Sequence, residues 1–187
     1  MLEVDTKAPI FWVDMTAYAP MLQAAREAID ELRISHPEST PSNVKAVYMS
    51  PWKSHLLNEK LHPLCLHAMA TAKQASKDFW NTDIDALNLD FMIADCWGVI
   101  YEESDETILH SHYPSDFSAV IYLEADENCA PIIFEQKLVV NPQPNVMIMF
   151  PGYMRHEVPQ NHGKRSIIAL NMNKIPSAAI LAHTQKA

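Results

Sequence analysis

The sequence has few glycines and few cysteines, and each shortage argues against a class of site. With only three glycines among 187 residues, the chain has no glycine-rich loop of the kind that binds nucleotide phosphates. The three cysteines, Cys65, Cys96 and Cys129, form no CxxC pair, so neither a disulfide framework nor a thiolate zinc site is indicated. We expect them to be reduced thiols, buried or half-buried, in a cytoplasmic protein.

Long apolar runs and an excess of basic charge are also missing. No stretch of the sequence reaches the length of a transmembrane helix. The N-terminal segment lacks the basic and then apolar pattern of a secretory signal. The formal charge of -9 at pH 7 argues against a surface that neutralises nucleic-acid phosphates. We therefore expect neither a membrane nor nucleic acid as a partner.

The first 85 residues contain the apolar pattern of two helices. Leu22 to Leu32 carry apolar residues at helical spacing, which predicts a helix that ends at His36. A second apolar stripe runs from Leu61 to Phe79. Short strands are predicted at 10–13 and 44–48. Both helices are expected to pack against a sheet.

Beyond residue 85 the apolar pattern changes to period two, which is typical of strands. A first strand is predicted from Leu87 to Tyr101. Further strands are predicted at 117–123, 131–134, 137–140, 146–150, 153–158 and 166–172. So many short strands predict a sandwich, barrel or jelly roll, in a mainly β domain with N-terminal helices. We expect one domain over 1–187, with a helix-rich supporting region (1–85), a β core (86–175) and a tail (176–187).

Three histidines lie where such a core could hold a metal ion. Residues i and i+2 of a strand point to the same side, so His110 and His112 can both face the interior while Ser111 turns away. His156 follows an apolar strand and a Pro-Gly turn. Neutral imidazoles are preferred ligands of Zn, Cu, Fe and Ni. On these residues alone, a structural role for each histidine remains open.

Arg165 lies nine residues after His156 and could bind an acid beside the metal. The segment 159–164 predicts a hairpin that returns the chain to the vicinity of His156. The fork of a guanidinium suits a carboxylate, which it binds through two parallel hydrogen bonds. A surface charge near a turn is the alternative interpretation of Arg165.

In this order the motifs resemble the Fe(II)- and 2-oxoglutarate-dependent oxygenases, and most closely their small bacterial and phage-type branch. The resemblance covers residues 90 to 173. The elements that carry it are a strand with Trp97, the His110-x-His112 pair, the strand Val120–Leu123, the run Phe150-Pro151-x4-His156-Glu157-Val158, and a strand from Arg165 to Asn171. The resemblance implies a double-stranded β-helix, a jelly-roll variant with a cupin-like barrel.

The resemblance also implies the cofactors and their ligands. Fe(II) would be held by His110, His112 and His156, and the distal carboxylate of 2-oxoglutarate would bind Arg165. Tyr122, and less directly Tyr101, would lie on the cosubstrate side. The implied activity is that of a non-haem dioxygenase, which uses O2 to hydroxylate a small molecule or a peptide and releases succinate and CO2. The sequence does not identify the substrate, and it leaves open whether the chain forms a homodimer.

Two features depart from the usual family pattern. The commonest triad has two histidines and one carboxylate, and here His112 stands at the carboxylate position, so a metal site without turnover is an alternative. Asp116 could supply a carboxylate instead, but we expect it to stabilise a turn. Many members of the family also have a hydroxyl residue two or four positions after the arginine. This chain has Ile167 and Ala169 at those positions.

Two other functions remain open. The spacing His110-x-His112-x3-Asp116, with Pro151 before His156, is also similar to the cupin pattern, which would give a dioxygenase or isomerase without 2-oxoglutarate. That hypothesis leaves Arg165 unexplained. A catalytically silent ligand-binding relative is the third hypothesis. The four tryptophans are interpreted as core or hinge aromatics.

Overall fold

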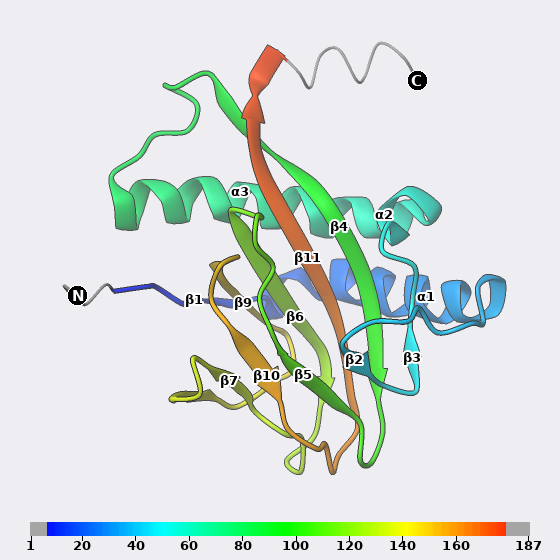
Figure 1. The fold of residues 1–187 in the computed structure, drawn as a ribbon. Helices are drawn as coiled ribbons and strands as arrows, with labels where there is room; N and C mark the ends of the chain where they lie inside the picture. Colours follow the sequence, from blue (N-terminus) through cyan, green and yellow to red (C-terminus); the bar gives the residue numbers. More distant parts are fainter. Residues whose placement is uncertain (1–6, 179–187) are drawn as a thin grey trace.

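The computed structural model describes residues 7–178, which form two facing β-sheets supported by helices (Figure 1). The helices are η1 (Thr16–Tyr18), α1 (Ala19–Ser35), α2 (Ser54–Leu57), η2 (Glu59–Leu61) and α3 (His62–Trp80). The larger sheet has the order β1 (Phe11–Asp14), β9 (Val146–Pro151), β6 (Phe117–Ala125), β11 (Arg165–Pro176), β4 (Leu89–Tyr101) and β3 (Tyr48–Met49). The smaller sheet has the order β2 (Val44–Lys45), β5 (Glu106–His110), β10 (His156–Val158), β7 (Ile132–Phe134) and β8 (Leu138–Val140).

The order of the strands identifies the fold. From β4 onward the chain alternates between the sheets. The strands β4, β6, β9 and β11 lie in the larger sheet, and the strands that come between them, β5, then β7 and β8, then β10, lie in the smaller sheet. All pairings between these strands are antiparallel. This is the winding of a jelly roll, and the predicted double-stranded β-helix is confirmed.

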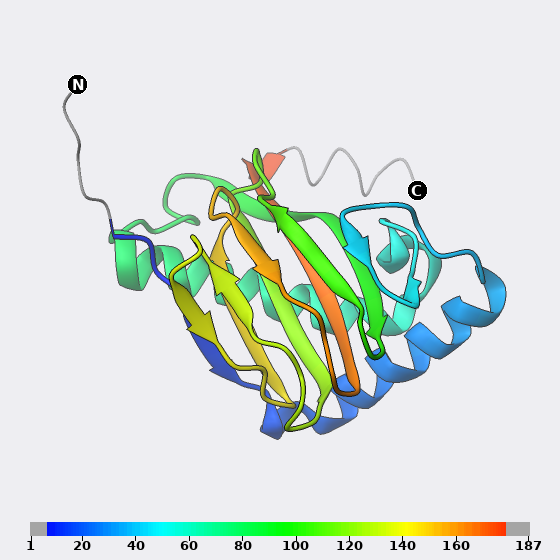
Figure 2. The ribbon, with the colours of Figure 1, turned by 60° about the horizontal axis from the view of Figure 1, so that its bottom comes forward.

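The two long helices cover one face of the larger sheet, and the smaller sheet lies against its other face (Figures 1 and 2). Alternation along the strands divides the core accordingly. Ile168 and Leu170 of β11 pack against the helices, whereas Ile167 and Ala169 face the smaller sheet. The helices contribute small and aliphatic side chains to the first of these cores, at Leu22, Ala25, Ala28, Ile29 and Leu32 of α1 and Leu64, Cys65, Ala68, Ala72 and Ala75 of α3.

The predicted helices agree with α1 and α3, and most predicted strands agree in position, but three details were wrong. The strand predicted at 44–48 is two strands, because β2 pairs with β5 in the smaller sheet and β3 pairs with β4 in the larger. The strand β5 was not predicted. The segment 159–164 is not a hairpin, since β10 and β11 belong to different sheets and the chain crosses between them.

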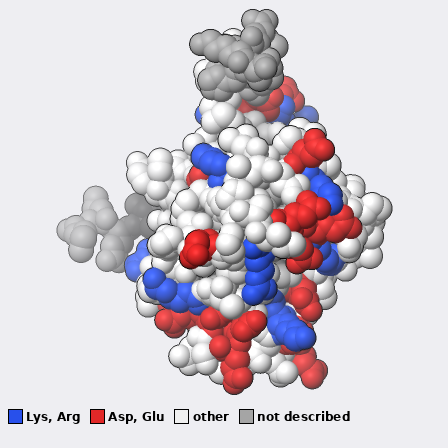
Figure 3. All heavy atoms as spheres, turned by 90° about the vertical axis from the view of Figure 1, so that its right-hand side faces the viewer, with Lys and Arg blue, Asp and Glu red and all other residues white. Residues whose placement is uncertain are grey.

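Other expectations concern the surface and the termini. Among the described residues, no helix is long and apolar enough to cross a membrane. Cys65 and Cys96 are buried and Cys129 is half-buried, all as free thiols. On the face drawn in Figure 3, Lys and Arg side chains lie among Asp and Glu side chains rather than in one basic patch. Most of the predicted tail, residues 179–187, lies outside the described residues.

Candidate metal centre

Pairing of β5 with β10 brings the three histidines together. His110, the last residue of β5, lies directly opposite His156, the first residue of β10. His112 follows two residues beyond the end of β5. The ring centroid of His110 is 4.3 Å from that of His156 and 4.8 Å from that of His112, and the His112–His156 distance is 5.0 Å. One ring nitrogen of each residue lies within 4.8 Å of the others, as a shared metal ion requires.

Two of the imidazoles are oriented by backbone carbonyls. The Nδ1 of His110 is 2.8 Å from the carbonyl oxygen of Ile108, and the Nδ1 of His156 is 3.1 Å from that of Met154. Because a carbonyl only accepts, each Nδ1 carries the hydrogen and donates it. The lone pair is then left on Nε2, the atom free to bind a metal. Such a partner behind the ring fixes both tautomer and orientation in metal sites.

Burial keeps the three rings neutral. Loss of solvent lowers the pKa of His112 to about 2 and that of His156 to about 3, with a further contribution from the neighbouring imidazoles. Burial also lowers the pKa of His110. A neutral imidazole is the form that binds a metal, so the donor set is ready for a cation at neutral pH.

The turn at Gly152 holds His112 in place. The amide of His112 donates to the Gly152 carbonyl at 2.8 Å, and the Gly152 amide donates to the Asp116 carbonyl at 3.1 Å. A Cβ at position 152 would collide with the backbone carbonyl of Ser115, so only glycine allows these two loops to approach so closely. This contact ties the residues after His112 to the turn before His156.

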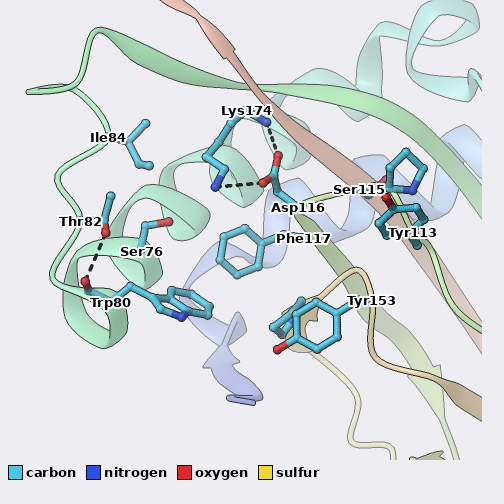
Figure 4. Close-up of a pocket in the computed structure, with 12 residues that line it drawn as sticks. Ser76, Trp80, Thr82, Ile84, Tyr113, Ser115, Asp116, Phe117, Tyr153 and Lys174 are labelled. Carbon is cyan, nitrogen blue, oxygen red and sulfur yellow. Dashed lines mark hydrogen bonds and ion pairs between the residues drawn. The ribbon is translucent and has the colours of Figure 1, made fainter. Parts of the chain in front are cut away.

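Asp116, the alternative carboxylate, takes no part in this cluster. Its Oδ1 pairs with the Lys174 ammonium at 2.9 Å, and its Oδ2 accepts from the Lys174 amide at 2.7 Å (Figure 4). Asp116 is therefore a structural residue, but its side chain fixes the loop to β11 instead of stabilising a local turn as we expected. The acid that a cupin-like site would need is not supplied from this position.

Arg165 reaches the same interior from the opposite sheet. It begins β11, where it pairs with Tyr101 of β4, and its side chain is only 2% exposed. Its Cζ lies 4.9 Å from the ring centroid of Tyr101 and 5.1 Å from that of Tyr122. Nη1 donates to the Ala130 carbonyl at 3.1 Å. Arg165 and the three histidines line one inner cavity between the sheets.

Two polar groups beside this cavity have no partner. The Nε of Arg165 and the hydroxyl of Tyr122 are buried without a hydrogen bond, and Arg165 forms no ion pair with any of residues 7–178. The hydroxyl of Tyr101, in contrast, lies 2.7 Å from that of Thr107. Burial raises the pKa of both tyrosines, so they remain protonated and can donate. An unpaired guanidinium costs several kcal/mol to bury, which favours an anionic ligand at this position.

The space around the site divides into pockets of different size. The inner cavity between the histidines and Arg165 measures about 30 Å³. An outer pocket of about 330 Å³ opens from His110 and His112 toward solvent, and it is lined by Asp95, Trp97 and Trp52 among others. A third pocket of about 450 Å³, which is lined by Trp80 and Phe117 among others, contains none of the three histidines (Figure 4). The outer pocket borders His110 and His112, so it is the more suitable reaction site.

Sequence reasoning did not identify the outer pocket. Trp52 was interpreted as a core or hinge aromatic, but it is 36% exposed and lies on the pocket wall. Asp95 carried no motif. It lines the pocket because its strand pairs with β11 at Asn171, a contact between residues 76 positions apart. The one signal in the sequence for Asp95 is that it lies two residues before Trp97 on the same strand, so both side chains point to the same side.

Comparisons with known proteins support the fold. No protein-family model matches the sequence, and no curated protein matches it. Among solved structures, a 2OG-Fe(II) oxygenase family oxidoreductase from Burkholderia pseudomallei superposes with a TM-score of 0.64 at 15% identity, covering 88% of this chain and 85% of the other. A prolyl-4-hydroxylase from Pseudomonas putida gives 0.61 at 15% identity, covering 89% and 93%. The non-haem, alpha-ketoglutarate-dependent epimerase SnoN of nogalamycin biosynthesis gives 0.65 at 13% identity, covering 88% and 77%.

Proposed function

We propose that this chain is a non-haem Fe(II)- and 2-oxoglutarate-dependent dioxygenase that hydroxylates a small molecule or peptide. The observation that carries the proposal is the buried Arg165, which has no ion-pair partner among the described residues and lines the same cavity as three neutral histidines. A cation and a dicarboxylate together would satisfy both groups. The chemistry named for the structural relatives supports this choice, and the free thiols favour a cytoplasmic location.

The donor set fits the proposed cofactors. His110, His112 and His156 would hold Fe(II) through nitrogen atoms. The guanidinium of Arg165 would bind the distal carboxylate of 2-oxoglutarate, and the unpaired hydroxyl of Tyr122 would donate to the same group. Tyr101, whose hydroxyl is already paired with Thr107, would contribute its ring face to the guanidinium. When bound, Fe(II) and 2-oxoglutarate supply the oxidative decarboxylation that activates O2.

The protein contributes orientation and exclusion of water. The carbonyls behind His110 and His156 fix the ring planes before any metal arrives, so little order is lost on binding. Apolar side chains such as Val120, Ile132 and Ile167 line the inner cavity and keep bulk water from the reacting centre. Since His112 is neutral, the site carries one more positive charge than the usual triad, which strengthens its attraction for the dicarboxylate.

The size of the inner cavity favours a second candidate. About 30 Å³ accommodates roughly one water molecule, so 2-oxoglutarate would enter only if the lining side chains moved outward. A cupin-type metalloenzyme that binds its substrate in the outer pocket needs no such movement. A cupin-type enzyme has no carboxylate ligand for the buried guanidinium of Arg165, and for this reason it is the second candidate.

Anaerobic spectroscopy separates the two candidates. Fe(II) and 2-oxoglutarate added together to the wild-type chain should produce the weak visible charge-transfer band of the chelate. In Arg165→Ala the band should be lost at the same 2-oxoglutarate concentration while Fe(II) is still bound. Admission of O2 with candidate substrates should then release succinate, measured by NMR. A chain that binds Fe(II) but forms no band would instead support the cupin-type function.

A further inference from the structure

The outer pocket contains polar groups that the proposed function does not use. His110 and His112 border both this pocket and the inner cavity, so a molecule bound in the outer pocket lies next to the proposed metal. Asp95 and Trp97 enter from β4, and Trp52 enters from the segment between β3 and α2. This is the position from which a substrate would present a C–H bond to the metal.

The outer pocket is lined by one acidic side chain. Asp95 is the single Asp, Glu, Lys or Arg side chain among the residues that line it. Its Oδ2 accepts from the Asn171 amide at 3.3 Å, and Asn171 in turn accepts from the Ser118 hydroxyl at 2.8 Å. Lys53 lies 3.1 Å from Oδ1, but its side chain is 55% exposed and stands outside the lining. The carboxylate is thus held in a fixed orientation with lone pairs left for a ligand.

Two indole rings lie next to this carboxylate. Trp52 and Trp97 pack with ring centroids 4.8 Å apart at 65°, and Trp97 lies 5.9 Å from the ring of His112. Trp52 is fixed to β4 because its carbonyl accepts from the Cys96 amide at 2.8 Å. Indole faces attract cations, and an exposed indole beside a carboxylate is a common arrangement for recognising an ammonium group.

We infer that the outer pocket binds a substrate that carries a primary ammonium group, paired with Asp95 and placed against the indoles of Trp52 and Trp97. This inference rests on the proposed function. With three neutral histidines, the charges of a divalent ion and a dicarboxylate cancel, and Arg165, the remaining charge of the site, does not line the outer pocket. On the same wall, Asn43 has an unpaired Nδ2 that can donate to an oxygen of the natural substrate.

Three probes of similar shape test the charge preference. We would titrate the full-length chain, with and without Zn(II), with 2-phenylethylamine, its neutral isostere 2-phenylethanol, and the anion 3-phenylpropanoate, by calorimetry at pH 7.5. The amine should bind at least about tenfold more tightly than the alcohol, the usual scale for one partly buried charge pair. Preference for the anion, equal affinity for all three, or no binding of the amine would overturn the inference.

Matched variants assign any binding to Asp95. Asp95→Asn should weaken amine binding about tenfold and leave binding of the alcohol unchanged. Asp90→Asn is the control, because Asp90 lies on the same strand, pairs with Lys73 at 3.0 Å and is 31% exposed, against 30% for Asp95. Lys53→Gln should strengthen amine binding about two- to threefold, since it removes the competing cation. Weaker binding in Lys53→Gln, or amine binding that needs Zn(II) and persists in Asp95→Asn, would contradict the inference.

The outcome is separable from that of the proposed function. Binding of 2-oxoglutarate is measured in the same preparations and depends on Arg165, which does not line the outer pocket. If 2-oxoglutarate binds but the amine does not, only the inference about the substrate fails. If the amine binds at Asp95 but 2-oxoglutarate does not bind, the pocket assignment stands and the cosubstrate is wrong.

Discussion

The two faces of the larger sheet use the same strands for different purposes. Along β11, Ile168, Leu170 and Met172 pack against the helices in a mainly apolar core. Arg165 and Asn171 of the same strand face the smaller sheet, where polar groups are buried. The helices also bury single unpartnered imidazole nitrogens, at His55 and His67, but the other side of the sheet keeps an unpaired guanidinium nitrogen of Arg165 next to the unpaired phenol of Tyr122.

This difference separates side chains that only pack in a core from side chains that can bind a ligand. Buried polar groups are almost always hydrogen-bonded, so an orphaned pair in a well-packed interior indicates a missing ligand. Both faces bury apolar side chains, but Arg165 and Tyr122 on the face toward the smaller sheet are polar groups that an apolar core does not require. Substitution of an apolar residue on the helix face should therefore affect folding, whereas substitution of Arg165 or Tyr122 should affect binding.

The largest expected effect comes from the histidines. His156→Ala should lower Fe(II) affinity by more than about 100-fold, which is the upper range for loss of a mere supporting partner. His162→Ala, at an exposed loop position, is the control and should leave the affinity unchanged. Anaerobic Fe(II) titration measures both. Equal metal binding by the two variants would remove His156 from the site.

Arg165→Leu tests the binding face. Loss of the guanidinium should reduce 2-oxoglutarate affinity by about 2–5 kcal/mol. The free energy of unfolding of the ligand-free protein should not fall, because an uncompensated buried charge is removed. Chemical denaturation and cosubstrate titration give the two quantities. A strongly destabilised variant would mean that Arg165 is a structural residue.

Leu170→Ala tests the helix face of the same strand. Leu170 is fully buried, and its truncation should cost about 2–5 kcal/mol of unfolding free energy. The affinity of the folded fraction for 2-oxoglutarate should be unchanged. Should this variant lose affinity as Arg165→Leu does, the two faces would not be independent.

The smallest effect distinguishes the two tyrosines beside Arg165. Tyr101→Phe breaks a hydrogen bond to Thr107 and should destabilise the fold by about 1 kcal/mol. Tyr122→Phe removes an unpaired hydroxyl, so it should not destabilise the fold, but it should weaken 2-oxoglutarate binding by about 1 kcal/mol. The reverse assignment of the two effects would show that Tyr122 makes no cosubstrate contact.

Local sequence patterns predicted much of the fold, because periodicity reports which side of a segment is buried. The helical stripes of α1 and α3 and the alternation in β4, β6 and β9 all agree with the structure. The strand β5 was missed because its residues, Glu106 to His110, show little apolar alternation. The split of 44–48 depends on two different pairing partners, which no local pattern contains.

The clustering of the three histidines was predicted for a reason that was only partly right. The three histidines come together as expected, although His112 lies beyond the end of its strand. Arg165 reaches the cavity from the opposite sheet, not through a hairpin beside His156. Asp95 and Trp52 were not predicted, since their positions on the pocket depend on contacts between distant segments, and only the alternation with Trp97 pointed to Asp95.

A crystal grown anaerobically with Fe(II) and 2-oxoglutarate would test the central claim directly through its anomalous difference map at the iron edge. The account predicts one peak at bonding distance from the Nε2 atoms of His110, His112 and His156, and a dicarboxylate that extends from it to Arg165. A peak elsewhere, or a dicarboxylate that does not contact Arg165, would contradict it.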